Sequence, residues 1–409
     1  MRITICGAGN AAQTLTALLA SDHRNDVVVY APLGNEAAQL ASALDASGIS
    51  ADFAGRGVRS GRPHLVTADP EAAGSAADYV LLALPSFAHE SVLTALAPSL
   101  APDARIGALP ARGGFDWLVR AVLPEHRGIV FGLQTLPWAC RIQEWGRRVQ
   151  VLGVKAQVDV AAWSAEESAL IAAEVSALIE VPLRPISGFL ALTLANTGQI
   201  LHPGIMFGRL QDWDGQPFAA DAVPLFYAGV DERTAQVLQE MSDEIQSLCR
   251  ALEQRLPGLD LSSVAPLRKW LLDAYPSQIA DASSLRTALN SNSAYAGIRF
   301  PVEAAGGDGW SPSFSNRYLS EDVPFGLLVT RGIAELADVT TPTIARVIGW
   351  AQARIGREYL VDGCVAGRDL PTTRAPQRFG INALSDLLHG SMARPKAATG
   401  ASHDEGNRR

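Results

Sequence analysis

The sequence predicts an α/β fold, in which an N-terminal doubly wound parallel sheet is followed by a second, mainly α-helical domain. Short apolar runs without polar alternation, separated by helical patterns, fill the first half, as in a parallel sheet covered on both faces. From about residue 188 strand-like runs become scarce and patterns of helical period dominate. A chain of 409 residues is long enough for two such domains. We therefore expect a sheet domain over residues 1–188, a helical domain over residues 189–388, and a disordered tail over residues 389–409, which is small and polar.

The predicted strands of the first half are joined by helices, so right-handed crossovers would order them in a doubly wound sheet. The first strand, Arg2–Cys6, enters a glycine turn, and a later strand closes at Pro85 ahead of a helix that starts near His89. The predicted strands are residues 2–6, 26–30, 78–84, 129–136 and 149–154, and the other predicted helices are residues 11–21 and 36–47.

The second half contains five helical patterns and two turn-rich stretches, which we interpret as connecting or site-forming loops. No internal repeat is visible. The helices are expected at residues 190–201, 232–256, 262–275, 325–336 and 342–356, and the loops at residues 204–217 and 304–312.

Composition and charge exclude several classes of function. With 34 Lys+Arg against 42 Asp+Glu the net charge is −8, which argues against a general nucleic-acid binder and a binder of anionic membranes. The four cysteines are far apart and form no CxxC pair, so we expect no zinc ribbon, no disulfide scaffold and no metal site. The chain enters an apolar strand at Arg2 without a targeting segment, and no run approaches the ~20 apolar residues of a membrane-spanning helix. These observations predict a cytoplasmic protein with reduced cysteines.

The turn after the first strand carries the strongest motif, GAGNAA, in which Gly7, Gly9 and Ala12 occupy the GxGxxG/A positions. Gly7 permits a tight turn, Gly9 lets the backbone approach a pyrophosphate, and Ala12 allows close packing of helix on sheet. Asn10 and Ala11 open the following helix, whose N-terminus offers free N–H groups and the positive end of a dipole. The motif predicts a dinucleotide site, and the alternative is a plain tight turn.

The choice of cofactor depends on charges near the second strand. No acid occupies residues 30–32, where a ribose-binding carboxylate usually lies, but no Lys or Arg occurs between Arg24 and Arg56 either. A 2′-phosphate would therefore lack a counter-charge, and we expect NAD, with NADP as the alternative. A later strand exit, where such folds place backbone against the nicotinamide ribose, offers Leu84, Pro85 and Ser86. A simple strand cap is the alternative there.

A nicotinamide-dependent enzyme also needs a group that moves a proton, and histidine suits that task near neutral pH. His202 stands out among the seven histidines because it begins the second half, in NTGQILHPGIM, just before a helix-breaking Pro-Gly. That position predicts an interdomain hinge facing the cleft. A structural histidine is the alternative.

The stretch RYLSEDVPFG offers two further candidates. Asp322 could orient a histidine and stabilise its charged form, and Arg317 could hold a carboxylate through two parallel hydrogen bonds. For both residues a purely structural role is the alternative. Arg317 and Glu321 are spaced i, i+4 and could form a surface pair, whereas Asp322 could cap the helix that starts at Val323.

Several motifs together resemble one family, the opine dehydrogenases of the octopine/nopaline type. The resemblance runs from GAGNAA to about Gly380 and depends on an ordered series at matching spacing. The motifs are LPWACR (136–141), GRRVQVLGVK (146–155), ILHPG (200–204), LRKWLLDAY (267–275), SSLRTALNSNSAYAG (283–297), RYLSEDVPFGLLVTRGIAEL (317–336) and TTRAPQRFG (372–380).

The resemblance implies an N-terminal Rossmann domain, a helical C-terminal domain, and small-molecule substrates that meet in the cleft between them. It also implies reductive condensation. The amine of an amino acid and a 2-oxo acid, usually pyruvate, form an imine that NADH reduces to an N-(1-carboxyalkyl)amino acid. The family's catalytic histidine, its partner aspartate, and the arginine that holds the oxo-acid carboxylate match His202, Asp322 and Arg317.

The amino-acid pocket departs from the family's arginine-using members, which carry an acidic residue shortly before PWAC. Gln134 occupies that place here, so a guanidinium would lose a counter-charge. A smaller or neutral amino acid is then at least as plausible a substrate as arginine. By the same resemblance Cys140 and Trp270 are pocket walls, and core packing is the alternative for both.

Two competing functions stay open. A 2-oxo-acid or ketopantoate-type reductase also pairs a Rossmann half with a helical half, and it would need no amine. A non-catalytic nucleotide-binding protein could keep the fold, but it would have no need of an acid–base pair beside a carboxylate anchor.

Overall fold

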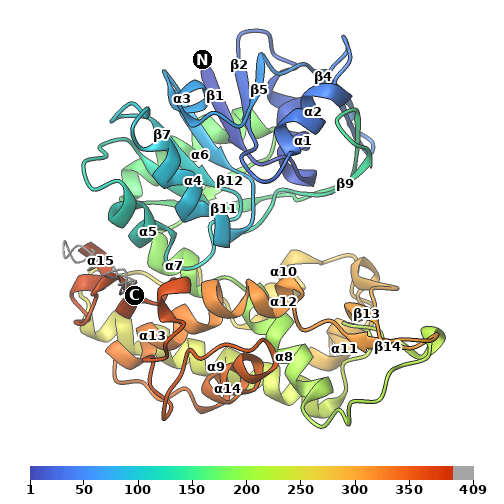
Figure 1. Ribbon diagram of the computed structural model, residues 1–409. Coiled ribbons are helices and arrows are strands. Elements are labelled where there is room, and N and C mark those ends of the chain that lie inside the picture. Colours follow the sequence, from blue (N-terminus) through green and yellow to red (C-terminus); the bar gives the residue numbers. More distant parts are fainter. Residues whose placement is uncertain (390–409) are drawn as a thin grey trace, which may run out of the picture.

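An eight-stranded sheet forms the centre of the N-terminal domain in the computed structural model, which describes residues 1–389 (Figure 1). Its order is β12-β11-β8-β7-β6-β1-β2-β5, and every neighbouring pair is parallel except β8 with β11. The chain runs outwards from β1 to one side and then returns to β6 on the other, so the doubly wound topology is confirmed. The strands are β1 (Arg2–Cys6), β2 (Asp26–Tyr30), β5 (Leu65–Thr67), β6 (Tyr79–Leu82), β7 (Arg105–Ala108), β8 (Val130–Leu133), β11 (Val158–Ala162) and β12 (Leu183–Pro185).

Alternate side chains of these strands fill both faces of the sheet. Val28 on β2 packs into one buried cluster, whereas its neighbours Val27 and Val29 pack into the other. The helices α4 and α5 contribute to the first cluster and α1 and α6 to the second, which explains the continuous apolar runs. The helices are α1 (Asn10–Leu19), α2 (Glu36–Ala43), α3 (Pro70–Gly74), α4 (His89–Leu96), α5 (Phe115–Val122) and α6 (Ala165–Ile179), with a 3₁₀ turn η1 (Ser86–Ala88).

A second sheet of four strands, in the order β4-β3-β10-β9, stands beside the first. It contains the strand predicted at residues 149–154, so the expectation that this segment joins the main sheet is wrong. Val149 and Val151 are buried while Gln150 and Leu152 are more exposed, an alternation typical of a sheet with one open face. The strands are β3 (Ile49–Phe53), β4 (Gly57–Gly61), β9 (Trp138–Glu144) and β10 (Arg148–Val154).

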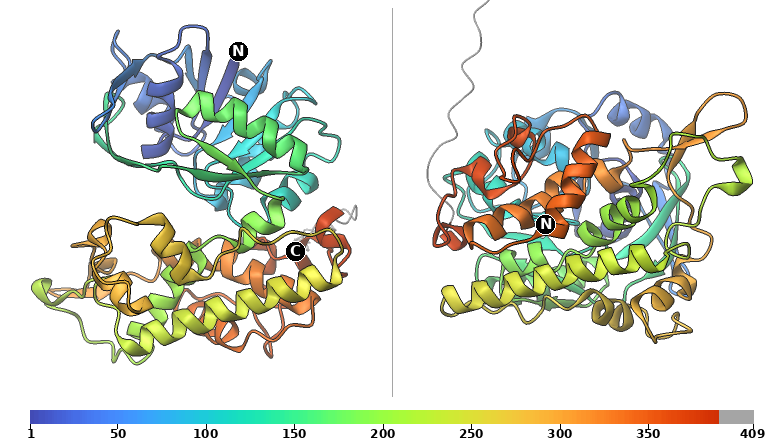
Figure 2. Two further views of the ribbon diagram at one scale, coloured as in Figure 1. Left: turned by 180° about the vertical axis from the view of Figure 1, so that it is seen from behind. Right: turned by 90° about the horizontal axis from the view of Figure 1, so that it is seen from below.

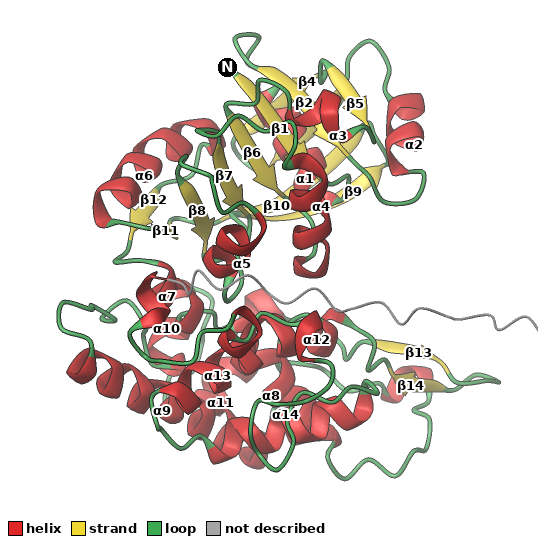
Figure 3. Ribbon diagram, turned by 60° about the vertical axis from the view of Figure 1, so that its left-hand side comes forward, coloured by secondary structure: helices red, strands yellow, loops and turns green. Residues whose placement is uncertain are grey.

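Helices make up nearly all of the second domain, as predicted (Figure 3). The long helix α9 crosses it from end to end in the view from behind (Figure 2). The helices are α7 (Phe189–Leu194), α8 (Gly198–Leu210), α9 (Glu232–Arg255), α10 (Leu267–Ala274), α11 (Leu285–Asn290), α12 (Arg317–Ser320), α13 (Leu328–Leu336), α14 (Pro342–Arg354) and α15 (Asp386–His389). Shorter elements are η2 (Ala220–Ala222), η3 (Ser293–Tyr295), the π-helical turn η4 (Val323–Leu327), η5 (Leu370–Thr372), η6 (Pro376–Phe379), and the hairpin of β13 (Val302–Ala304) with β14 (Trp310–Pro312).

The helix predicted at residues 190–201 is wrong in its bounds. The segment is divided between α7 and α8, and α8 continues through Pro203, where we expected a break. A proline removes one main-chain donor, but α8 packs against α9 and α14, and this packing offsets the lost hydrogen bond. The loop expected at residues 204–217 therefore starts only after Leu210, and part of the loop at 304–312 is the hairpin.

A segment near the C-terminus returns from the helical domain to the sheet domain and joins the two. Arg374 is buried, and its guanidinium donates to the carbonyl oxygens of Ala111 and Ser86. The indole N–H of Trp117 on α5 donates to the carbonyl oxygen of Leu387. One of the two buried clusters accordingly extends through both domains.

Because β12 ends at Pro185 and α7 begins at Phe189, we propose residue 188 as the domain boundary.

None of the helices within residues 1–389 has both the length and the apolar composition that crossing a bilayer demands. The expected disorder of residues 389–409 falls outside the described residues, except that His389 ends α15.

Candidate active site

A cleft of about 740 Å³ opens between the sheet domain and the helical domain. Its walls contain the glycine turn, the carboxyl ends of β6, β7 and β8, and residues of α8 and α12. Ligands of α/β folds bind at such carboxyl ends, beside the point where the strand order reverses. The candidate residues that line the cleft are Gly9, Asn10, Ala11, Leu84, Pro85, Gln134, Cys140, His202, Trp270 and Arg317.

The turn after β1 has the geometry that a dinucleotide requires. Gly7 has φ +118°, and a Cβ there would lie 2.8 Å from the carbonyl oxygen of Ala83, so the fold itself needs glycine. A Cβ on Gly9 would meet no protein atom within 4 Å, so the missing side chain leaves space for a ligand. Asn10 accepts the N–H of Ile142 at 2.7 Å, while no side chain caps the first N–H groups of α1. These free donors fit a pyrophosphate.

Leu84 and Pro85 line the cleft, whereas Ser86 is buried and bonded to the other domain. The Ser86 hydroxyl and N–H donate to Glu321 at 3.0 and 3.2 Å. Glu321 thus connects the two domains. The surface pair with Arg317 that the i, i+4 spacing suggested does not form. Ala12 is also buried, where α1 packs on the sheet.

His202 on α8 and Asp322 at the start of η4 form a hydrogen bond of 2.7 Å between Nδ1 and Oδ2. A carboxylate only accepts hydrogen bonds, so Nδ1 carries the proton. Burial raises the pKa of Asp322, but the charges of Arg112 and His202 outweigh burial and hold this pKa below its ordinary value. The side chain of Asp322 makes no capping bond to η4. An ionised carboxylate therefore fixes the tautomer of the imidazole and leaves Nε2 at the cleft.

Two tyrosines complete the surroundings of the His202 ring. The hydroxyl of Tyr227 lies 2.9 Å from Nε2, and the ring of Tyr318 stacks on the imidazole at 4.1 Å between centroids. Burial raises the pKa of Tyr227 well above its ordinary value, so the phenol keeps its proton and is a donor for Nε2 when that nitrogen carries none. A substrate group that needs this nitrogen would replace the Tyr227 hydroxyl.

Arg112, between β7 and α5, is a site residue that sequence reasoning missed. Its Nη1 lies 2.7 Å from Oδ1 of Asp322 and donates to the Asn196 side chain at 3.1 Å, and the arginine side chain is 8 % exposed. Its backbone has φ +57°, a conformation that is uncommon for non-glycine residues. A Cβ on Gly198 would lie 2.9 Å from the same Nη1. The available signal was the cation in LPARGG, directly after a strand whose carboxyl end faces the cleft.

Arg317 begins α12 with an exposed side chain, and it has no bonded protein partner among the described residues. Its charge also acts to lower the pKa of Asp322, which places it near the dyad. A guanidinium in this position is available to a carboxylate in the cleft.

The residues expected in the amino-acid pocket lie on two walls of the cleft. Gln134 follows β8, and its amide donates to the carbonyl oxygen of Ala195 at 2.9 Å. Cys140 on β9 is 1 % exposed, and burial raises the pKa of its thiol, so it is not an activated nucleophile. Trp270 on α10 packs edge-on against Tyr275. Cys140 and Trp270 thus belong to the packed wall as well as to the cleft surface.

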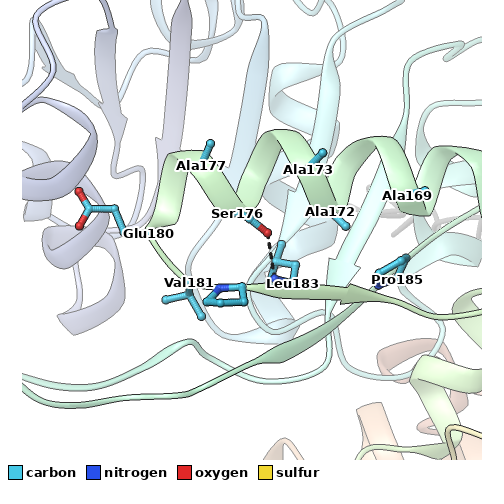
Figure 4. A pocket seen from close by; sticks show the side chains of 10 residues that line it. Ala169, Ala172, Ala173, Ser176, Ala177, Glu180, Val181, Leu183 and Pro185 are labelled. Carbon is cyan, nitrogen blue, oxygen red and sulfur yellow. Dashed lines mark hydrogen bonds between the residues drawn. The ribbon is translucent and has the colours of Figure 1, made fainter.

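A second hollow lies between α6 and the edge strand β12 (Figure 4). Small apolar side chains line most of it, and the N–H of Leu183 donates to the hydroxyl oxygen of Ser176. Glu180 is its one titratable lining residue, and Arg59 binds that carboxylate. This hollow offers no acid–base pair.

Over residues 1–389, no three His, Cys, Asp or Glu side chains gather as metal ligands.

Comparisons with known proteins agree with this geometry. A family model described as NAD/NADP octopine/nopaline dehydrogenase, alpha-helical domain, matches residues 185–355, and one described as ketopantoate reductase PanE/ApbA matches residues 3–109. The octopine dehydrogenase of Pecten maximus is 39% identical over 402 residues, which cover 95% of this chain and 99% of that protein. The chain belongs to the opine dehydrogenase family.

Two further opine dehydrogenase relatives cover nearly the same length. The tauropine dehydrogenase of Arabella iricolor is 36% identical over 94% of this chain and 99% of its own. A solved structure of an octopine dehydrogenase with NADH and L-arginine has a TM-score of 0.89 and 38% identity, and covers 96% of this chain and 99% of that one.

As an opine dehydrogenase the chain is an NAD(P)-dependent oxidoreductase that acts on the CH–NH group, by reductive condensation of an amino acid with a 2-oxo acid. The predicted family, fold class and enzyme class are thereby confirmed, as is NAD with NADP as the alternative. The ketopantoate-type match covers residues of the sheet domain alone.

Proposed function

We propose that this enzyme condenses pyruvate with an amino acid that has a small or neutral side chain, preferring NADH, and that His202 is its acid–base group. The observation that carries the proposal is an imidazole at the cleft whose Nδ1 is bonded to the buried carboxylate of Asp322. The octopine dehydrogenase solved with NADH and L-arginine supports an amino acid beside the cofactor.

The cofactor would lie with its pyrophosphate at the glycine turn and its nicotinamide ribose against the backbone of Leu84 and Pro85. Gly7, Gly9 and the uncapped start of α1 fit this placement. Bound NADH supplies the hydride. The absence of Lys and Arg between residues 24 and 56 favours NADH over NADPH.

The protein's own groups anchor the acid and move the proton. Arg317 holds the carboxylate of the 2-oxo acid through two parallel N–H bonds. In the condensing direction His202, protonated on both nitrogens, gives its Nε2 proton to the hydroxyl that leaves the carbinolamine, so water departs and the protonated imine that is to be reduced forms. In the oxidising direction neutral Nε2 accepts a proton from the water that adds to the protonated imine. Asp322 stabilises the imidazolium without taking its proton.

We also propose that the enzyme works in the cytoplasm. Cys6, Cys140, Cys249 and Cys364 are all free, and the first three are buried. Unpaired cysteines are typical of proteins in a reducing compartment.

The proposal is tested by NADH oxidation with pyruvate and a panel of amino acids that includes taurine and β-alanine, with NADPH in parallel. We expect oxidation that requires both pyruvate and the amine. Oxidation with pyruvate alone would assign a 2-oxo-acid reductase instead. NADH binding without turnover across the panel would assign a non-catalytic protein.

Replacing Gln134 by glutamate is expected to shift the substrate preference toward arginine and lysine. A carboxylate at this place would pair with a basic side chain, and a hydrogen bond to a charged group contributes about 1.5–3 kcal/mol, or roughly 10- to 100-fold in relative kcat/KM. The measurement is kcat/KM for Arg, Lys, Ala and Met. Gln236→Glu, on the exposed face of α9, makes the same charge change away from the cleft. Unaltered relative kcat/KM values in Gln134→Glu would refute the role of this residue.

A further inference from the structure

Lys155, the residue that follows β10, presents an ammonium group to the same cleft. Its Nζ donates to the carbonyl oxygen of Leu136 at 2.9 Å, and its main-chain N–H donates to Pro137 at 3.0 Å. Both bonds hold the lysine against the loop that carries Gln134. Its position is therefore fixed by the loop, unlike that of a free surface lysine.

The positive charge of Lys155 has no counter-charge in the part of the chain that the structure describes. Among residues 1–389 no carboxylate lies within ion-pair distance of Nζ, and the Leu136 carbonyl uses one of the three N–H donors of the ammonium. Burial lowers the pKa of Lys155, as expected for an ammonium partly removed from water without an ionic partner. A partly buried unpaired charge is costly, and an anionic ligand in the cleft would supply the missing partner.

Within residues 1–389, the lining that the sheet domain gives to the cleft contains cations and no Asp or Glu. Burial raises the pKa of the Cys140 thiol, while Arg141 and Lys155 both act to lower it, so both cations lie near this sulfur. Gln134, on the same wall, is neutral. Arg317 stands on the other domain, at the start of α12. The cleft thus has cations from both domains, and the condensation joins two molecules that each carry an acidic group.

We propose that Lys155 binds the acidic group of the amino donor, a carboxylate or a sulfonate, while Arg317 binds the carboxylate of the 2-oxo acid. This assignment rests on the proposed function and adds a specificity residue to it. It means that an amine without an acidic group is a poor donor.

The test compares L-alanine with alaninamide, which keeps the amine but lacks the negative charge, in the wild type and in Lys155→Met. We expect the variant to raise KM for alanine about 10- to 100-fold, the effect of losing a hydrogen bond between charged groups, with KM for pyruvate and Kd for NADH unchanged. The preference of the wild type for alanine over alaninamide should disappear. Lys155→Arg should retain most of that preference. The control Arg148→Met removes an exposed cation from the other end of β10.

Two results would overturn the assignment: a preference for alanine that survives in Lys155→Met, or a loss confined to NADH binding. If the wild type shows no amine-dependent oxidation, the proposed function fails, and calorimetry of the enzyme–NADH complex still decides the role of Lys155. Binding of alanine that is stronger than binding of alaninamide in the wild type, and equal in Lys155→Met, would support the subsite. Equal binding in the wild type would reject it.

Discussion

His202→Ala is expected to lower kcat/KM for condensation about 10²–10⁴-fold, the usual contribution of a positioned acid–base group. The carbinolamine would lose the Nε2 proton that assists departure of its hydroxyl. Binding of NADH should stay intact, because the glycine turn lies in the sheet domain and His202 on α8 in the helical domain. Steady-state kinetics and a fluorescence titration with NADH measure the two quantities separately.

The pH profile distinguishes lost chemistry from lost structure. The profile of kcat/KM against pH in His202→Ala should lack a limb that the wild type has, because the group that moves the proton is gone. The matched control is His64→Ala, because the His64 side chain is 68% exposed and belongs to the sheet domain. Turnover near the wild-type value in His202→Ala would exclude the proposed role.

The features that the sequence predicted well are local. The strand Arg2–Cys6 and the turn at Gly7 each need only a few adjacent residues, and the long helix α9 repeats its period over many turns. The strand β10 was recognised by its apolar residues, yet its membership in the second sheet depends on pairing with β3 and β9. Pro203 was misjudged for a similar reason, since the packing of α8 decides whether the helix continues.

The site could be predicted only in part, because it is assembled across the domain interface. Spacing alone left His202 and Asp322 with structural alternatives, and the family resemblance singled them out. Their contact joins α8 to the start of η4, which no local pattern reveals. Arg112 was missed because its function depends on a carboxylate in the other domain. Lys155 ends the motif GRRVQVLGVK, but only the folded chain shows that its ammonium group has no ionic partner among residues 1–389.

Arg112→Met is expected to destabilise the fold and slow turnover together. Breaking a buried ion pair costs about 3–5 kcal/mol, because Asp322 would stay buried without its arginine partner, bonded to His202. The imidazole would lose the rigid position of its partner, and a misplacement of about 1 Å costs up to roughly 100-fold in rate. Arg233→Met is the control, since Arg233 pairs with Asp212 and the two side chains are 57% and 72% exposed. We expect this control to retain both stability and kcat.

The dependence of stability on pH tests the link between Arg112 and Asp322 directly. In the wild type the depressed pKa of Asp322 adds stability above the unfolded-state pKa of about 3.9, and this is lost as the pH falls through the folded-state pKa. Burial raises the pKa of Asp322, and in Arg112→Met the charge of Arg112 no longer opposes this effect. The folded-state pKa of Asp322 therefore rises in the variant. The variant's loss of stability relative to the wild type, measured as the shift of the urea midpoint, should be largest near neutral pH. It should shrink as acid protonates Asp322. A deficit that stays constant with pH would mean that Arg112 supports packing alone and does not keep the carboxylate ionised.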